Sequence, residues 1–166
     1  MASLTPIDPS SWNSGAARHL LNRAGFGVPR ELAEKLAFMP PDVAVNFLVD
    51  YESIPSDYPE PDFLEPALTY KERGALRKGL SDDERRELQQ KWQRDERKAV
   101  QTLRGWWLQR IRTTSRPLEE KMALFWHGHF ATSAQKVKPS EHNYALNAVF
   151  RTHATGNFKQ LVTEVG

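Results

Sequence analysis

The feature that most constrains the fold is an uninterrupted helical pattern that runs from Ser81 to about Arg112. Ser81 and Glu84 form a capping box, S-x-x-E, and Asp82 and Asp83 suit the positive N-terminus of a helix. At 1.5 Å per residue, the predicted helix is about 45 Å long. Its first half is mostly charged, whereas its second half carries large apolar residues: Val100, Leu103, Trp106, Trp107 and Ile111. The second half must therefore pack against other elements.

Apolar residues recur at helical spacing on both sides of this stretch. They predict helices over residues 12–24, 29–38, 42–51, 117 to the FWHGHFATS motif, 140–154, and a last one capped by Asn157. After the first of these, Gly25 is expected to take a left-handed conformation. Neither a run of alternating strands nor an internal repeat is present. We therefore predict one all-α domain over residues 1–166, an orthogonal, irregular helical bundle with a long basic helix.

Two of these helices are expected to supply most of the buried surface. In the helix from Pro117, four apolar residues share one face: Leu118, Met122, Phe125 and Trp126. The helix from Ser140 is apolar around most of its circumference and is expected to be deeply buried. Residues 53–66 contain four prolines and four acidic residues, so they are predicted to form a loop or linker.

Composition excludes several kinds of site. The chain of 166 residues has no cysteine, so disulfides and thiolate metal sites are excluded, and any metal needs His, Asp or Glu ligands. No run of 18 apolar residues occurs, so no membrane span is expected. The sequence shows no secretory signal at its N-terminus, which leaves the compartment open.

The long helix lies in the basic part of the chain. Residues 67–112 carry 13 Lys and Arg against 7 Asp and Glu, and such a stripe could contact nucleic-acid phosphates. Acidic residues alternate with the basic ones at helical spacing, however. A solvated face held by ion pairs is therefore the better interpretation.

The FWHGHFATS motif, residues 125–133, places His127 and His129 on either side of Gly128. In an extended backbone these side chains point to the same side and could converge on a divalent metal or a haem, whereas in a helix they point about 200° apart. Gly128 follows the apolar stripe and favours a break, so the chelating geometry is the hypothesis that we test. A third ligand would have to come from Glu120, His142 or His153, or from outside the chain.

Two other interpretations of the histidines stay open. In one, His127 caps the preceding helix as an imidazolium and His129 donates to a backbone carbonyl in a buried turn. In the other, the pair performs acid–base catalysis. Covalent catalysis has little support, because Ser133 and Ser140 lie outside any G-x-S-x-G motif. His19, on the first helix, is expected to be a packed or surface residue.

Three stretches together resemble one bacterial family, the domain-of-unknown-function 1800 family. They are AARHLLNRAGFG (Ala16–Gly27), PLEEKMALFWHGHFATS (Pro117–Ser133) and FRTHATGNFKQLV (Phe150–Val162). The resemblance implies a mainly helical protein without an established activity, and many relatives look exported. Members are usually longer, so it also implies that this chain, which ends at Gly166, is the N-terminal portion of a longer protein.

Two classes of function follow. The first is a helical scaffold or interaction domain, whose partner is another protein or the C-terminal portion of longer relatives. The second is a metalloprotein, haem-binding or enzymatic domain that uses His127 and His129 with ligands beyond Gly166. We favour the first, because the sequence contains no clear third ligand. The sequence does not identify a catalytic residue.

Overall fold

The computed structural model describes residues 5–27, 30–56, 58–63, 68–131 and 139–166. This part of the chain contains α-helices, two short 3-10 helices and no strand, so the predicted all-α class is confirmed. The elements are η1 (Pro9–Ser11), α1 (Ser14–Ala24), α2 (Arg30–Ala37), α3 (Pro41–Val49), η2 (Tyr51–Ser53), α4 (Tyr70–Arg77), α5 (Asp82–Thr113), α6 (Pro117–His129), α7 (Ser140–Thr152) and α8 (Phe158–Val165). Among the described residues, no helix combines the length and the apolar character that a membrane crossing requires.

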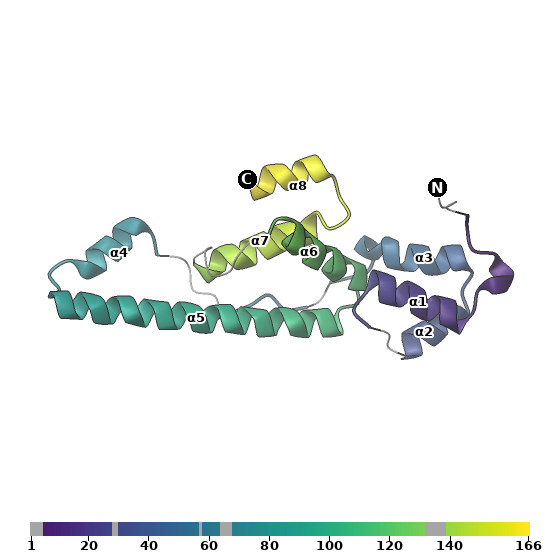
Figure 1. The fold of residues 1–166 in the computed structure, drawn as a ribbon, viewed down its shortest axis with the longest axis horizontal. Helices are drawn as coiled ribbons and strands as arrows, with labels where there is room; N and C mark the ends of the chain where they lie inside the picture. Colours follow the sequence, from purple (N-terminus) through teal and green to yellow (C-terminus); the bar gives the residue numbers. More distant parts are fainter. Residues whose placement is uncertain (1–4, 28–29, 57, 64–67, 132–138) are drawn as a thin grey trace.

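The molecule is elongated along α5. Figure 1 shows α1, α2 and α3 gathered at one end, while α4 and the first half of α5 extend to the other. Helices α6, α7 and α8 lie over the second half of α5. The first half of α5 therefore projects as an arm, and the second half is the base on which the C-terminal helices are assembled.

Helices α1, α2 and α3 enclose a small apolar core. Its buried side chains are Ala17, Leu21, Ala24, Ala33, Leu36, Ala44 and Leu48. Asn13 caps α1 by accepting hydrogen bonds from two backbone N–H groups of the first turn, so the helix begins two residues later than predicted. Leu118 of α6 packs against this core and joins it to the C-terminal half of the molecule.

Helix α5 begins at the predicted capping box. The Ser81 N–H donates to Glu84 at 2.7 Å, and the Glu84 N–H donates back to the Ser81 hydroxyl at 3.4 Å. At 1.5 Å per residue, the helix is about 48 Å long. Two exposed i,i+3 ion pairs follow in its first turns, Asp82–Arg85 and Asp83–Arg86.

Helix α4, which was not predicted, folds back along the arm of α5 (Figure 1). It has its own capping box, formed by Thr69 and Glu72, and this pattern was the available signal in the sequence. No residue of α4 is buried. The guanidinium groups of Arg73 and Arg77 lie 5.6 and 5.3 Å from the ring centre of Trp92, and these cation–π contacts hold α4 against α5.

A second apolar core lies between α6, α7 and α8. Ala123, Phe150 and Leu161 are its fully buried members. Partly buried side chains complete it: Trp107, Trp126, Phe130, Leu146, Val149 and Val165. Trp107 comes from α5, so the base helix contributes to this core directly.

The acidic, proline-rich segment is held along the second half of α5. Of the predicted loop over residues 53–66, positions 57 and 64–66 lie outside the described residues. The Trp106 indole donates to the carbonyl of Pro59 at 2.9 Å, and the Tyr58 hydroxyl donates to the carbonyl of Trp106 at 3.3 Å. Ser115 donates to the carbonyl of Pro55 at 3.3 Å. The described part of this loop is therefore bound to the helices.

The buried faces of α6 and α7 differ from those expected. On α6, Glu119 and Glu120 are buried with Ala123, while Phe125 is 53% exposed. On α7, Asn147 and Arg151 are buried with Phe150. Each helix buries a strip of polar side chains, because the two strips face one another and pair. The apolar pattern of a single helix does not predict such pairing between helices.

Gly25 is extended, with φ −150°, so the predicted left-handed conformation at this position is wrong. A methyl group at Gly25 would lie 3.0 Å from Cβ of Pro117 and 3.2 Å from the carbonyl oxygen of Leu21. Glycine is needed here because the start of α6 packs against the end of α1. Gly27, two residues later, is the position with positive φ, at 151°.

Candidate functional site

His127 and His129 both lie at the end of α6, which continues through Gly128 without a break. The prediction that Gly128 interrupts the helix is therefore wrong. Helical side chains two positions apart point about 200° from each other, so the two imidazoles face different surroundings and do not converge on one ion. The helix ends just beyond, where Ala131 takes a positive φ of 46°.

His127 points into the interface between α5, α6 and α7. Its ring centre lies 4.8 Å from that of Trp107 and 4.7 Å from that of Phe150. The side-chain amide of Asn147 donates to Nε2 of His127 at 3.0 Å. Burial, and secondarily the charge of Arg151, lowers the pKa of His127 from 6.5 to about 4. His127 is thus a neutral hydrogen-bond acceptor at neutral pH, and its predicted role as a capping imidazolium is wrong.

His129 points away from that interface and is exposed among aromatic rings. The centre of the His129 ring lies 5.6 Å from the ring centre of Trp126 and 6.1 Å from the ring centres of both Phe125 and Phe158. The expected burial of His129 in a turn is therefore wrong. We call the exposed group formed by Phe125, His129 and Phe158 the aromatic face.

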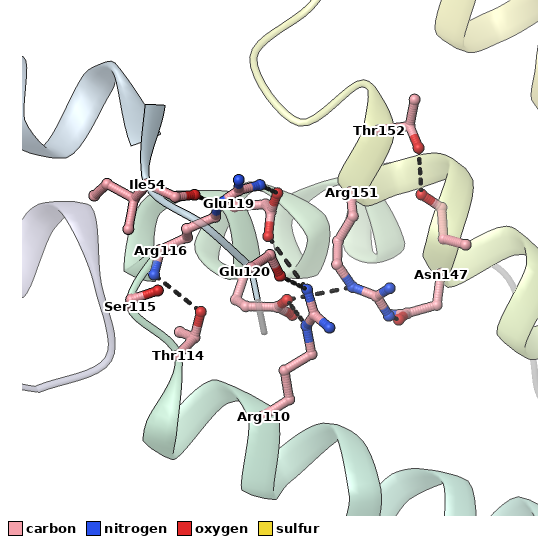
Figure 2. Close-up of polar contacts among 12 residues, drawn as sticks. Ile54, Arg110, Thr114, Ser115, Arg116, Glu119, Glu120, Asn147, Arg151 and Thr152 are labelled. Atoms are coloured by element: carbon pink, nitrogen blue, oxygen red, sulfur yellow. Dashed lines mark hydrogen bonds and ion pairs between the residues drawn. The ribbon is translucent and has the colours of Figure 1, made fainter. Parts of the chain in front are cut away.

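The most strongly buried charge in the described residues belongs to Glu120, which is 0% exposed. Its carboxylate accepts hydrogen bonds from Nε of Arg110 at 2.5 Å and from the Trp107 indole at 2.7 Å. Nε of Arg151 lies 3.2 Å from the same carboxylate. Figure 2 shows Arg110 and Arg151 reaching Glu120 from α5 and α7 respectively. One carboxylate thereby ties together three helices.

Glu119 extends this network toward the loop before α4. Its carboxylate lies 3.4 Å from Nη2 of Arg110 and 3.1 Å from Nη1 of Arg116. Arg116 also donates to the backbone carbonyl of Ile54 at 2.6 Å (Figure 2). It donates to the backbone carbonyl of Glu52 at 3.4 Å as well. The five charged residues, Arg110, Arg116, Glu119, Glu120 and Arg151, are called the ionic network below.

The ionic network reaches His127 through two side chains of α7. Nη2 of Arg151 donates to Oδ1 of Asn147, and the amide nitrogen of Asn147 donates to His127. These hydrogen bonds select the tautomer of His127 that accepts at Nε2. They also fix the orientation of the His127 ring and place the positive charge of Arg151 near it, which favours the neutral imidazole.

A hollow of about 340 Å³ opens beside the ionic network. Arg110, Arg116 and Arg151 line it together with Glu52, Glu60 and Glu119. Burial lowers the pKa of Arg151, and the charge of Arg110 lowers it further, against the opposing effect of the nearby carboxylates. This hollow is polar, and its charged walls suit a small charged molecule rather than an apolar one.

The other predicted candidates are scattered. His19 and His142 are exposed, and His153 pairs with Glu164 at 3.0 Å. Ser133 lies outside the described residues. Over the described part of the chain, no group of three or more His, Cys, Asp or Glu side chains is arranged to hold a metal ion.

Sequence reasoning missed the arginines of the ionic network and considered Glu120 only as a distant metal ligand. A signal was available in the helix from Pro117. Two adjacent acidic residues, Glu119 and Glu120, lie between the apolar Leu118 and Met122. The identity of their partners was not available, because Arg110 and Arg151 are separated from Glu120 by 10 and 31 positions.

The comparisons with known proteins agree with the resemblance noted in the sequence. No curated protein and no solved structure matches the chain. A family profile described as "Protein of unknown function (DUF1800)" matches residues 19–166. The matched range contains the whole ionic network, the aromatic face and both histidines of the FWHGHF motif. The chain belongs to the DUF1800 family of proteins of unknown function.

Proposed function

We propose that this chain is a helical scaffold or interaction domain, and that its partner binds the aromatic face. The observation that carries the proposal is the exposure of two large rings that both lie close to His129: Phe125 of α6 and Phe158 of α8 are each 53% exposed. Both lie within 6.1 Å, centre to centre, of the His129 ring between them. Exposed aromatic rings gathered in one place are typical of protein-binding surfaces.

The aromatic face is built on a rigid support. Trp126 stacks against Phe158 with ring centres 5.7 Å apart, and its indole donates to the carbonyl of Ala154 at 2.9 Å. The loop between α7 and α8 is thereby fixed to α6. A surface that is already ordered loses little conformational entropy on binding, which favours affinity.

The chemistry of the face favours a protein segment that supplies apolar side chains. The segment belongs either to a separate protein or to the C-terminal portion that longer family members carry. A nucleic-acid partner for the aromatic face is disfavoured, because the arm of α5, which carries many of the basic residues, lies away from this face (Figure 1). Two of the basic residues on the arm, Arg85 and Arg86, pair with Asp82 and Asp83.

Site-specific photo-crosslinking tests the proposal. A photoreactive phenylalanine analogue is placed at position 125, and at position 108 as the matched control, because Leu108 is an exposed apolar residue of α5 outside the face. We expect one protein, or a longer form of this chain, to crosslink at 125 and not at 108. The crosslinked partner is then purified and titrated with the wild-type chain.

The substitutions Phe125→Ser and Phe158→Ser are expected to weaken that binding by about 30-fold or more, as the loss of a central aromatic contact does, whereas Leu108→Ser leaves it unchanged. Equal crosslinking at 125 and 108, or equal affinity of the three variants, would show that the aromatic face is not the binding surface.

Metal or haem binding through His127 and His129 stays an alternative proposal. Because the two side chains diverge on α6, each would need further ligands from outside the described residues. Elemental analysis and an absorption spectrum of the wild type, beside His127→Ala and His129→Ala, test it. Stoichiometric metal or haem that is lost in either variant would favour this alternative, and sub-stoichiometric metal in the wild type would contradict it for this chain.

A further inference from the structure

The hollow beside the ionic network has features that scaffolding does not require. It holds about 340 Å³, within the usual range for a small-molecule site, and it is open to solvent at one side. Two of its walls are the guanidinium groups of Arg110 and Arg151, whose residues are 5% and 8% exposed. Arginines buried to this extent normally have partners for all their N–H groups.

These two guanidinium groups have donors to spare. Arg110 uses Nε toward Glu120 and Nη2 toward Ser56 and Glu119. Arg151 uses Nη2 toward Asn147, and its buried Nε lies 3.2 Å from Glu120 without a hydrogen-bond partner among the described residues. Among the described residues, neither Nη1 has a hydrogen-bond partner. Both residues line the same hollow, so one ligand there could accept hydrogen bonds from both guanidinium groups.

The charges of the ionic network favour a ligand with one negative charge. Three buried or half-buried guanidinium groups share the two carboxylates of Glu119 and Glu120, which leaves one positive charge in excess. The exposed carboxylates of Glu52 and Glu60 at the rim bring the total to one negative charge, but water screens these two groups, whereas the excess positive charge lies among buried groups. These rim charges disfavour a ligand that carries two or more negative charges, such as a phosphate dianion.

We propose that the hollow binds the carboxylate of a small organic monoanion between Arg110 and Arg151. A carboxylate accepts two parallel hydrogen bonds from guanidinium N–H groups, so it suits donors that approach from two sides. It also neutralises the excess charge of the network. The apolar remainder of the ligand would lie against the side chains of Tyr144 and Ala148, which form another wall.

A nuclear magnetic resonance titration tests the site in the wild-type chain. The reporter is the indole N–H of Trp106, whose ring lies 5.9 Å from the guanidinium carbon of Arg110 and 5.3 Å from that of Arg151. Acetate, glycine and inorganic phosphate are added separately at constant ionic strength, with chloride as the reference ion. We expect acetate and glycine to shift this signal saturably, and phosphate to bind more weakly than either.

Three variants locate the binding. Arg151→Gln should abolish the saturable shift, and Arg85→Gln, on the arm of α5, should leave it unchanged. Glu60→Gln removes a rim charge from an exposed position and should tighten acetate binding about two- to fivefold, the range expected for one screened charge. Glu60→Gln keeps the test decisive if Arg151→Gln does not fold.

The outcomes separate clearly. Tighter binding of glycine than of acetate would support the carboxylate site and add recognition of an ammonium group by the rim glutamates, and equal binding would support recognition of the carboxylate alone. No saturable shift with either carboxylate, tighter binding of phosphate, or unchanged acetate affinity in Glu60→Gln would overturn the proposal. None of these results depends on the aromatic face, which lies on α6 and α8 away from the residues that are varied.

Discussion

At the scale of single residues, Glu120 depends most on its surroundings. It lies in the first turn of α6, where the positive end of the helix dipole favours a carboxylate. Arg110, Arg151 and Trp107 supply the polar contacts that offset its removal from water. The ionic network is stable only as a set, since each buried charge requires the others.

Removing the charge of Glu120 is therefore expected to be costly. We expect Glu120→Gln to lower the free energy of unfolding by about 3–5 kcal/mol, because two buried guanidinium groups lose their shared partner. Urea denaturation followed by circular dichroism measures this difference. Asp83→Asn, which breaks the exposed pair with Arg86, is the control and should change the free energy by less than about 0.5 kcal/mol. Similar losses in the two variants would contradict the structural role of the network.

His127 makes the stability of the fold depend on pH. Its pKa is about 4 in the folded chain and near 6.5 when unfolded, so the unfolded state binds more protons between these values. The free energy of unfolding should therefore fall as the pH falls from about 6.5 to about 4. We expect His127→Gln, which cannot titrate at this position, to lose less stability over this window than the wild type. Urea midpoints measured at several pH values check this, and parallel curves for the two proteins would contradict it.

At the scale of elements, the end of α6 answers the question raised by the FWHGHF motif. Gly128 is helical, its φ is not positive, and open space surrounds the position that a Cβ atom would occupy. Nothing local requires glycine there. Glycine has more conformational freedom than alanine in the unfolded chain, so ordering it at position 128 costs more entropy and weakens the helix.

Gly128→Ala should accordingly raise the free energy of unfolding by about 0.5–1 kcal/mol. Gly25→Ala is the matched comparison and should lower it, because the new methyl group would meet Pro117 and the backbone of Leu21. Thermal denaturation of both variants measures whether each substitution raises or lowers the free energy of unfolding. Destabilisation by Gly128→Ala would mean that α6 ends before this residue, and the chelating geometry of His127 and His129 would be reopened.

At the scale of the whole molecule, α6 connects the two apolar cores. Its Leu118 packs against the core of α1, α2 and α3, and its Ala123 belongs to the core of α6, α7 and α8. Ile54 and Pro59, which follow η2, also accept hydrogen bonds from Arg116 and from Trp106 of α5. These connections favour one domain that unfolds cooperatively.

The prediction is a single thermal transition. Leu36→Ala, in the first core, and Phe150→Ala, in the second, should each lower its midpoint, with losses of about 2–5 and 3–5 kcal/mol respectively. Calorimetry and near-ultraviolet circular dichroism of both variants would detect a second transition if one exists. Two transitions, each lowered by only one of the substitutions, would divide the chain into two domains.

The fold class could be predicted because helix formation depends on residues that are close in sequence. The capping box at Ser81 located the start of α5, and Asn157 located the start of α8. The candidate site was predicted less well. The side chains of His127 and His129 point apart on α6, and the arginines around Glu120 were not identified from the sequence. A residue pattern on one helix does not specify the residues of the helices that pack against it.

The sequence by itself determined that this chain is helical, where most of its helices lie, and which family it resembles. Those properties follow from local hydrogen bonding, capping and the spacing of apolar side chains. Only the tertiary structure decided that Glu120 is buried while Phe125 is exposed, and that His127 and His129 face apart. The physical reason is that a buried charge is stable only beside its partners, and Glu120 meets Arg110 and Arg151 only after three helices have packed together.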